Sequence, residues 1–142
     1  MIHEDSLKIA VLGPKGTFSN QIGTIFGTLV NNDVDLVNCK SISNVVSSVN
    51  ASCPLAVLPI ENAIGGYVQQ SLDLLLNSKL TIIHEITLPI RYTFIGNVTA
   101  LSDIKTVFVQ YVAKDQCSRL LDSLESISIT QTQSNSESYL LY

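Results

Sequence analysis

The stretch over residues 54–76 constrains the fold of this chain more than any other part of it. An apolar run at residues 55–58 predicts a buried strand, and Pro59 ends it because proline cannot donate a hydrogen bond to a neighbouring strand. Two polar residues, Glu61 and Asn62, follow directly. In open α/β sheets, ligands bind just past the carboxyl ends of the strands. The order of these features therefore predicts a ligand-binding elbow.

A glycine pair and a helix complete this unit. Gly65 and Gly66 permit a sharp turn or a close approach of the backbone to a ligand. From Tyr67 onwards the apolar residues recur at helical spacing, with one face formed by Val68, Leu72, Leu75 and Leu76. The free N–H groups at the start of such a helix suit an anion. An ordinary strand-to-helix crossover with a glycine turn would give the same pattern, so both interpretations stay open.

The amino-terminal part repeats the same order of features. Residues 7–12 predict a strand, residues 13–16 a turn, and residues 20–30 a helix with Thr17 or Ser19 as its cap. The inner face of this helix is expected to consist of Ile22, Ile25, Phe26 and Leu29. The two hydroxyl groups either only cap the helix or also bind a ligand at the end of the strand.

The rest of the chain continues the alternation of strands and helices. A strand at residues 34–37 and a helix at residues 41–49 complete a βαβαβ unit, which winds right-handed into a parallel sheet. Further strands are predicted at residues 80–83, 91–95, 106–109 and 127–130, with a helix at residues 113–124 and a final helix capped by Ser134 or Asn135. The sequence therefore predicts an α/β protein.

Composition narrows the possible functions. The chain is 46% hydrophobic and 14% charged, which favours a packed core. Its net charge of −4 argues against nucleic acid as a partner, whereas local positive potential still permits a small anion. No apolar run reaches the ~18 residues that span a bilayer. The first six residues lack a basic leader, and the odd cysteine number without a CxxC motif favours reduced thiols, so a cytoplasmic protein is expected.

No metal site or cofactor is expected. The two histidines are far apart in sequence, and neither neighbours a cysteine. Cys39 and Cys53 are expected to be inert residues of the core or its edge.

Three segments resemble the signatures of the prephenate dehydratase family. Residues 58–68, Leu-Pro-Ile-Glu-Asn-Ala-Ile-Gly-Gly-Tyr-Val, are similar to its Pro-Ile-Glu-Asn-Ser segment and glycine turn, and Leu-Asp-Leu-Leu at residues 72–75 matches the ending of that motif. Residues 12–19, Leu-Gly-Pro-Lys-Gly-Thr-Phe-Ser, resemble the opening Gly-Pro-Glu-Gly-Thr-Phe-Ser. Residues 84–90, His-Glu-Ile-Thr-Leu-Pro-Ile, resemble Glu-Ile-x-Leu-Pro-Ile. The resemblance covers roughly residues 8–125.

The resemblance implies a two-lobed α/β fold like that of type II periplasmic binding proteins, with mostly parallel sheets and a cleft between the lobes. The lobes are expected over residues 1–80 and 81–142. The implied activity is a lyase reaction of phenylalanine biosynthesis, the decarboxylating dehydration of prephenate (or arogenate) to phenylpyruvate (or phenylalanine). A homodimer that acts on this small dianion is expected. Two alternatives stay open: a non-catalytic module that binds a small carboxylate or regulates a partner, and a prephenate decarboxylase.

The motif positions imply which residues form the site. Catalytic roles fall on Thr17, Asn62 and Glu61, and substrate contacts fall on Ser19, Phe18, Ala63, Gly66, Arg91 and Tyr92. Ala63 stands where the family has a serine, and Tyr92 stands where it has a histidine. The family's Thr-Arg-Phe motif would lie beyond the equivalent of Tyr142.

Residue chemistry leaves other roles open for several of these positions. Asn62 is the best ligand candidate, because an amide donates to a carboxylate without repulsion. Glu61 is either a proton donor or a structural carboxylate that ties the elbow to helix N–H groups. Arg91 either pairs with a carboxylate or lies on the solvent face of a strand, and Tyr92 is either a proton donor or a core tyrosine.

Overall fold

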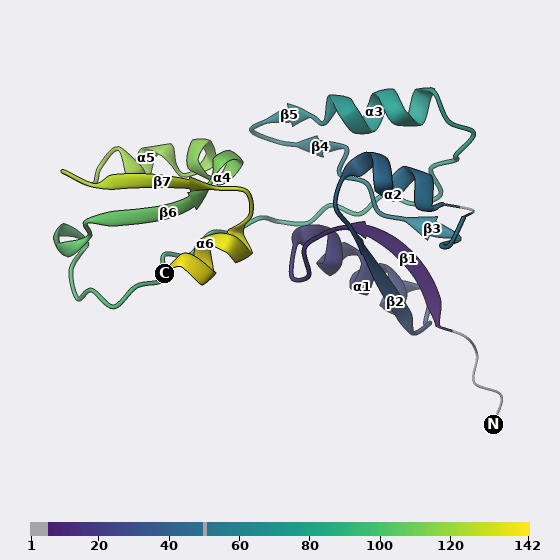
Figure 1. Cartoon of the computed structure of the whole chain (residues 1–142), viewed down its shortest axis with the longest axis horizontal. Helices are drawn as coiled ribbons and strands as arrows, with labels where there is room; N and C mark the ends of the chain where they lie inside the picture. Colours follow the sequence, from purple (N-terminus) through teal and green to yellow (C-terminus); the bar gives the residue numbers. More distant parts are fainter. Residues whose placement is uncertain (1–5, 50) are drawn as a thin grey trace. The chain divides into compact units, whose positions relative to one another are not determined.

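The computed structural model describes residues 6–49 and 51–142, which form two compact units divided after Leu88. Each unit contains its own parallel strands (Figure 1). Residues 1–5 and Asn50 lie outside the described residues. Residues 1–5 include His3 and most of the segment on which the expectation about a leader rests.

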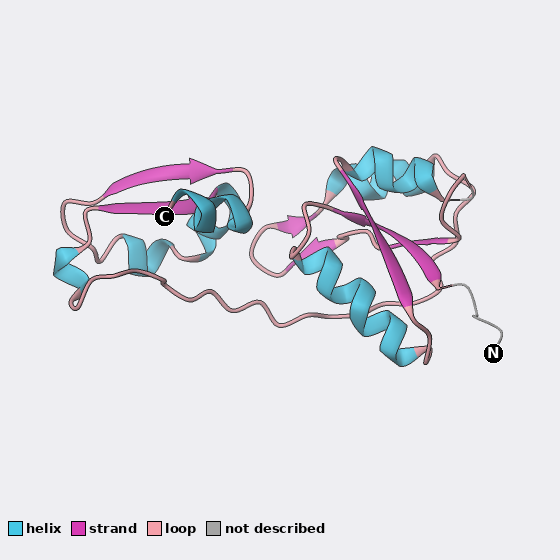
Figure 2. Cartoon of the chain, turned by 60° about the horizontal axis from the view of Figure 1, so that its bottom comes forward, coloured by secondary structure: helices cyan, strands magenta, loops and turns pink. Residues whose placement is uncertain are grey.

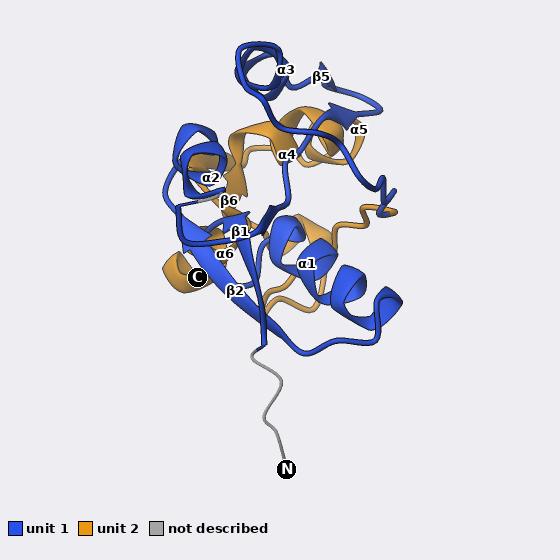
Figure 3. Cartoon of the chain, turned by 90° about the vertical axis from the view of Figure 1, so that its right-hand side faces the viewer, with its two compact units in different colours: residues 1–88 blue, residues 89–142 orange. Residues whose placement is uncertain are grey.

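Three parallel strands form the sheet of the first unit. They are β1 (Leu7–Leu12), β2 (Val34–Cys39) and β3 (Leu55–Ala56), in the order β2-β1-β3. The connections run through α1 (Phe18–Leu29) and α2 (Ile42–Ser48). The first crossover runs from β1 to β2 and the second runs back from β2 past β1 to β3. Because they cross the sheet in opposite directions, right-handed winding places the helices on opposite faces, as Figure 3 shows. The predicted βαβαβ unit is confirmed, and its strands all end at the same edge.

The core of the first unit forms around the central strand. Ile9, Ala10 and Val11 are each at most 1% exposed, because β1 is covered on both faces. Cys39 and Cys53 are also buried, next to Val45 of α2. Their burial agrees with the expected role of both cysteines as core residues.

Small residues, rather than large apolar ones, face the sheet from α1. Its buried residues are Asn20, Gly23 and Gly27, whereas Ile25 is 36% and Leu29 is 60% exposed. The predicted inner face is therefore wrong for Ile25 and Leu29. A Cβ atom at Gly27 would lie 2.5 Å from Cγ1 of Val34, so the helix backbone lies closer to the sheet than a larger residue would allow.

We expect Gly27→Ala to lower the free energy of unfolding by about 1–2 kcal/mol, because overpacking against a stiff side chain outweighs the better helix propensity of alanine. Val34 is β-branched and cannot easily turn away, and the carbonyl oxygen of Asn32 would lie 3.1 Å from the same Cβ atom. The matched control is Gly23→Ala, where the nearest atom is the mobile end of Leu36. Urea denaturation should show a clear loss of stability for Gly27→Ala but not for Gly23→Ala. Equal losses for the two substitutions would contradict this packing argument.

A hairpin lies between the sheet and the third helix. β4 (Glu61–Asn62) pairs antiparallel with β5 (Gly66–Tyr67), and α3 begins only at Gln69 and ends at Leu76. The helix that was expected from Tyr67 therefore starts later, since Tyr67 is engaged in the hairpin. Its buried face also differs from the prediction, because Leu76 is 82% exposed and Ser71 is fully buried.

Residues 79–99 form no helix or strand in the structure (Figure 2). The strands predicted at residues 80–83 and 91–95 are therefore wrong: apolar alternation identifies a face, but a strand also needs a hydrogen-bonding partner. The compact units divide after Leu88 rather than after Leu80, because part of this segment packs on the first unit. The ring of His84 meets that of Phe26 in α1 edge to face, with 5.8 Å between the ring centres.

The second unit is built on a two-stranded parallel sheet. Its elements are a 3₁₀-helix η1 (Leu101–Asp103), β6 (Thr106–Gln110), α4 (Tyr111–Gln116), α5 (Ser118–Leu121), β7 (Ser128–Thr132) and α6 (Asn135–Leu141). The single helix predicted over residues 113–124 is divided at Cys117 into two short helices, although no glycine or proline marks the break. The first of them begins early because the side chain of Gln110 accepts hydrogen bonds from two of its N–H groups.

Candidate functional site

Two elbows of the first unit follow neighbouring parallel strands. The first, residues 13–20, leads from β1 into α1, and the second, residues 59–68, leads from β3 through the hairpin into α3. Since β1 and β3 pair in parallel, both elbows begin at the same edge of the sheet. This edge is where an open α/β sheet binds its ligands.

Thr17 is the cap of α1. Its side-chain oxygen accepts a hydrogen bond from the backbone N–H of Asn20 at 3.5 Å, and its hydroxyl donates to the carbonyl oxygen of Leu12 at 2.8 Å. The hydroxyl therefore ties the helix to the end of β1. Because its proton is directed at Leu12, Thr17 can donate to a ligand only by giving up that bond.

The side chain of Asn20 joins the first elbow to the next strand. It is 8% exposed; its Oδ1 accepts from the N–H of Gly16 at 2.8 Å, and its Nδ2 donates to Oδ1 of Asn38 at 2.8 Å. Gly16 has a φ of 88°, which favours glycine. Asn20 and Asn38 were not among the predicted site residues. The spacing Thr-x-x-Asn, which resembles a capping box, is the signal that could have identified Asn20.

Asn62 shapes the turn of the hairpin. Its Oδ1 accepts hydrogen bonds from the N–H groups of Ile64 and Gly65, at 2.9 and 3.0 Å, so its oxygen is used inside the protein. The Nδ2 group of the half-buried side chain is the part that can donate to a ligand. The role of Asn62 as a donor to a ligand stays a prediction.

Glu61 lies beside Asn62 with its side chain exposed, opposite Tyr67 in the hairpin. Within the described residues, the N-cap position of α3 has no side-chain capping bond, so the structure gives no evidence for a capping role of Glu61. An exposed carboxylate at the edge of the sheet would repel a dianion unless it carries a proton.

The remaining candidates of the first unit surround these residues. Phe18 and Ser19, both half-buried, form the first turn of α1. Ala63 is exposed in the hairpin turn, and Gly66 has a φ of 74°, which a side chain would strain. All four therefore lie in the two elbows.

Arg91 and Tyr92 belong to the second unit and lie outside any strand, so the first-unit elbows are built without them. Both side chains are exposed, and Tyr92 retains 37% of its accessible surface, which does not fit a core tyrosine. Partial burial raises the pKa of the Tyr92 hydroxyl, a hydrogen bond with the side chain of Asn135 lowers it, and Cys117 raises it; the net pKa lies above the ordinary value.

Comparison with known proteins assigns this arrangement to a family. The family model of prephenate dehydratase matches residues 9–141. A bifunctional chorismate mutase/prephenate dehydratase of Enterobacter agglomerans is 31% identical over 134 residues, which are 93% of this chain and 35% of that protein. The arogenate dehydratase/prephenate dehydratase 1 of Arabidopsis thaliana, a chloroplastic protein, is 41% identical over 70 residues, which are 49% of this chain and 18% of that protein. This chain belongs to the prephenate dehydratase family.

Solved structures give the same assignment. The prephenate dehydratase of Staphylococcus aureus superposes with a TM-score of 0.76 at 25% identity, over 95% of this chain and 51% of that protein. The α/β fold with parallel sheets that the resemblance implied is thereby confirmed. The chain spans about a third of the length of the bifunctional relative and half of the solved dehydratase. Among the helices of the described residues, none has the length and apolar character needed to cross a membrane.

Proposed function

We propose that this chain takes part in the decarboxylating dehydration of prephenate, or of arogenate, and that the two elbows of the first unit hold the substrate. The observation that carries the proposal is the Asn62 amide: its oxygen is bound to two backbone N–H groups, so its Nδ2 is left to donate to a carboxylate. Membership of the prephenate dehydratase family supports the substrate.

The reaction needs orientation and one proton. The bond between the ring and its carboxylate breaks, and carbon dioxide leaves. The electron pair of that bond moves into the ring as the hydroxyl departs from the opposite (para) carbon. A proton delivered to that hydroxyl makes it leave as water, and the ring becomes aromatic. Asn62 and Thr17 would hold the dianion by neutral hydrogen bonds, and Glu61, when protonated, would supply the proton.

The cellular compartment and the oligomeric state belong to the same proposal. The free thiols of Cys39, Cys53 and Cys117 support a reducing compartment such as the cytoplasm. A homodimer remains our expectation, and sedimentation of the purified chain measures it directly.

Incubation of the purified chain with prephenate tests the proposal. We expect phenylpyruvate to form faster than in a protein-free control at the same pH, as measured by ultraviolet absorbance. We also expect prephenate to raise the unfolding temperature, because a ligand that binds only the folded state stabilises it. The proposal would be refuted if, at prephenate concentrations that saturate a known dehydratase, the chain formed no phenylpyruvate and was not stabilised.

A second function, binding of a small carboxylate without turnover, is favoured by one observation. The Thr17 hydroxyl already donates to the carbonyl oxygen of Leu12. Ala63 has no hydroxyl, whereas the family motif has a serine at this position, so the elbows hold fewer free donors than the motif supplies. Loss of one well-placed donor lowers catalytic rates by ~10²–10³-fold. Stabilisation by prephenate without product would favour this function, whereas loss of prephenate without an aromatic product would indicate a decarboxylase.

A further inference from the structure

A hollow of about 310 Å³ lies at the carboxyl ends of β1 and β2. It is lined by Gly13, Pro14, Asn38, Cys39 and Lys40. Gly13 continues the pairing of the two strands through a 2.8 Å hydrogen bond from its N–H to the carbonyl oxygen of Cys39. A Cβ atom at Gly13 would lie 3.2 Å from Cβ of Asn38, so the glycine allows the Asn38 side chain to stand close to the turn.

A chain of three hydrogen-bonding groups fixes which way the Asn38 amide faces. The backbone N–H of Gly16 can only donate, so the atom of Asn20 that meets it at 2.8 Å must be the oxygen. The other end of the Asn20 amide is then an NH₂ group, and it can only donate to Asn38. The atom of Asn38 that receives this bond must therefore be its oxygen. Because Asn20 is 8% exposed, water cannot easily replace either bond.

The outer end of the Asn38 amide is consequently an NH₂ group. Within the described residues it reaches the carbonyl oxygen of Leu36 at 3.4 Å, near the outer limit for a hydrogen bond. This second contact is also with an acceptor, so it agrees independently with the same orientation. The group has two hydrogen atoms, and the side chain is exposed beside the hollow.

We propose that Asn38 is a carboxylate-binding residue, and that the Gly16 N–H and Asn20 act as the relay that keeps its NH₂ group turned outward. The guest is a small carboxylate, and in the proposed reaction it is one of the two carboxylates of prephenate; the inference rests on that proposed function. Asn20 is a positioning residue, because it reaches the guest only through Asn38. A neutral amide suits this task, since it donates to an anion without having to shed a charge of its own.

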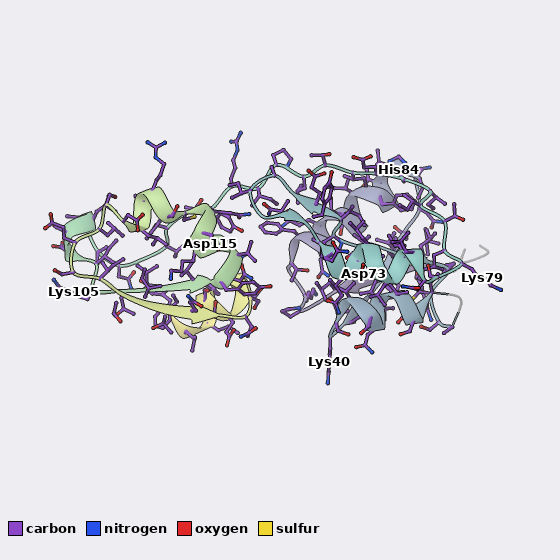
Figure 4. All side chains as sticks on the ribbon, turned by 90° about the horizontal axis from the view of Figure 1, so that it is seen from above. Lys40, Asp73, Lys79, His84, Lys105 and Asp115 are labelled. Atoms are coloured by element: carbon purple, nitrogen blue, oxygen red, sulfur yellow. The ribbon has the colours of Figure 1, made fainter. Side chains whose placement is uncertain are left out.

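Lys40 adds charge rather than a fixed contact. Its side chain lines the hollow but is exposed, and Figure 4 shows it extending away from the ribbon. Positive potential over the hollow attracts an anion even where no ammonium group is held in place. The binding that we propose therefore depends on Asn38, and it should weaken moderately as salt rises.

Three Asn-to-Asp substitutions test the relay with the same chemical change. Asn38→Asp keeps an acceptor for Asn20 but replaces the outward NH₂ by a negative oxygen. In Asn20→Asp, one carboxylate oxygen still accepts from the Gly16 N–H. The other oxygen replaces the NH₂ group that donated to Asn38, so the Asn38 amide must turn to donate its own NH₂ group inward. Asn38 then presents its oxygen to the guest. Asn32→Asp is the control: it adds the same charge at the opposite end of β2, ~20 Å along the strand and beyond the screening length in physiological salt.

We expect prephenate to bind Asn38→Asp and Asn20→Asp at least ~10-fold more weakly than the parent, since each loses a hydrogen bond to a charged group. Asn32→Asp should bind like the parent. The readout is the rise in unfolding temperature along a prephenate titration, with each unliganded protein as its own reference. If Asn38→Asp fails to fold, Asn38→Ala removes the NH₂ group without adding charge and should lose affinity to a similar degree.

The outcomes separate this inference from the proposed function. A parent that responds to prephenate, together with Asn38→Asp and Asn20→Asp variants that bind as tightly as the parent, overturns the relay and leaves the function intact. A parent that shows no thermal response and forms no phenylpyruvate overturns the function, and the inference with it. A loss in Asn38→Asp alone overturns the role of Asn20, because the relay requires both substitutions to act.

Discussion

The substitution Thr17→Val is expected to lower the free energy of unfolding of the first unit by about 1–3 kcal/mol, whereas Thr17→Ser should retain most of it. Valine has nearly the shape of threonine but neither donates nor accepts a hydrogen bond. It removes the 3.5 Å cap of the Asn20 N–H and leaves the carbonyl oxygen of Leu12 without its 2.8 Å partner. Serine keeps the hydroxyl, and therefore both bonds.

Urea denaturation followed by far-ultraviolet circular dichroism measures the difference, with one transition fitted for each unit where two are resolved. An exposed threonine of the same helix, Thr28, is the control. Its hydroxyl bonds the carbonyl oxygen of Thr24 one turn earlier, and Thr28→Val should change stability by less than ~0.5 kcal/mol. Equal stability of Thr17→Val and the parent would show that the hydroxyl is not needed to hold the helix on β1.

The parts of the fold that depend on local pattern were predictable. The strand at residues 7–12 was found with the predicted bounds, and β2 extends only two residues past its predicted end, because both are short, mostly apolar segments between turn residues. Ser41 was a predicted cap, and it accepts the N–H of Asn44. In each case the residues that determine the element lie within it or next to it, so the sequence alone contains the information.

The buried face of α1 was not predictable in the same way. Periodicity ranks residues by size and polarity, and it favoured Ile25 and Leu29 over Gly23 and Gly27. The structure buries the two glycines because their lack of side chains lets the helix approach β1 and β2 closely. Distance between elements is a property of the whole unit, and no local pattern reports it.

The candidate site likewise has a part that local sequence order predicts and a part that depends on strand pairing. The positions of Thr17 and Asn62 at strand ends follow from the order of strands and turns, and the structure places both in elbows at one edge of the sheet. The contact of Asn20 with Asn38 joins residues 18 positions apart and depends on the pairing of β1 with β2. A sequence without its strand register cannot bring such a pair together.

Asn62→Asp is expected to keep or raise the stability of the hairpin and to weaken prephenate binding by ~10-fold or more, since a donor to a charged group becomes a like charge. A carboxylate oxygen accepts the N–H groups of Ile64 and Gly65 at least as well as the amide oxygen does, so the turn is preserved. The outward atom changes from a donor NH₂ to a negative oxygen, so a dianion loses a hydrogen bond and meets repulsion.

This substitution separates the two roles that an elbow asparagine can have. If Asn62 only shapes the turn, aspartate serves equally well, and the prephenate titration of Asn62→Asp follows that of the parent. If it also holds the substrate, affinity falls although the unliganded protein unfolds at the same temperature or higher. Asn32→Asp, an exposed position of the first unit at the end of β2 opposite to the elbows, adds the same charge away from them and should leave binding unchanged. Affinity that falls equally in both variants would trace the loss to net charge, and Asn62 would then have no direct role in binding.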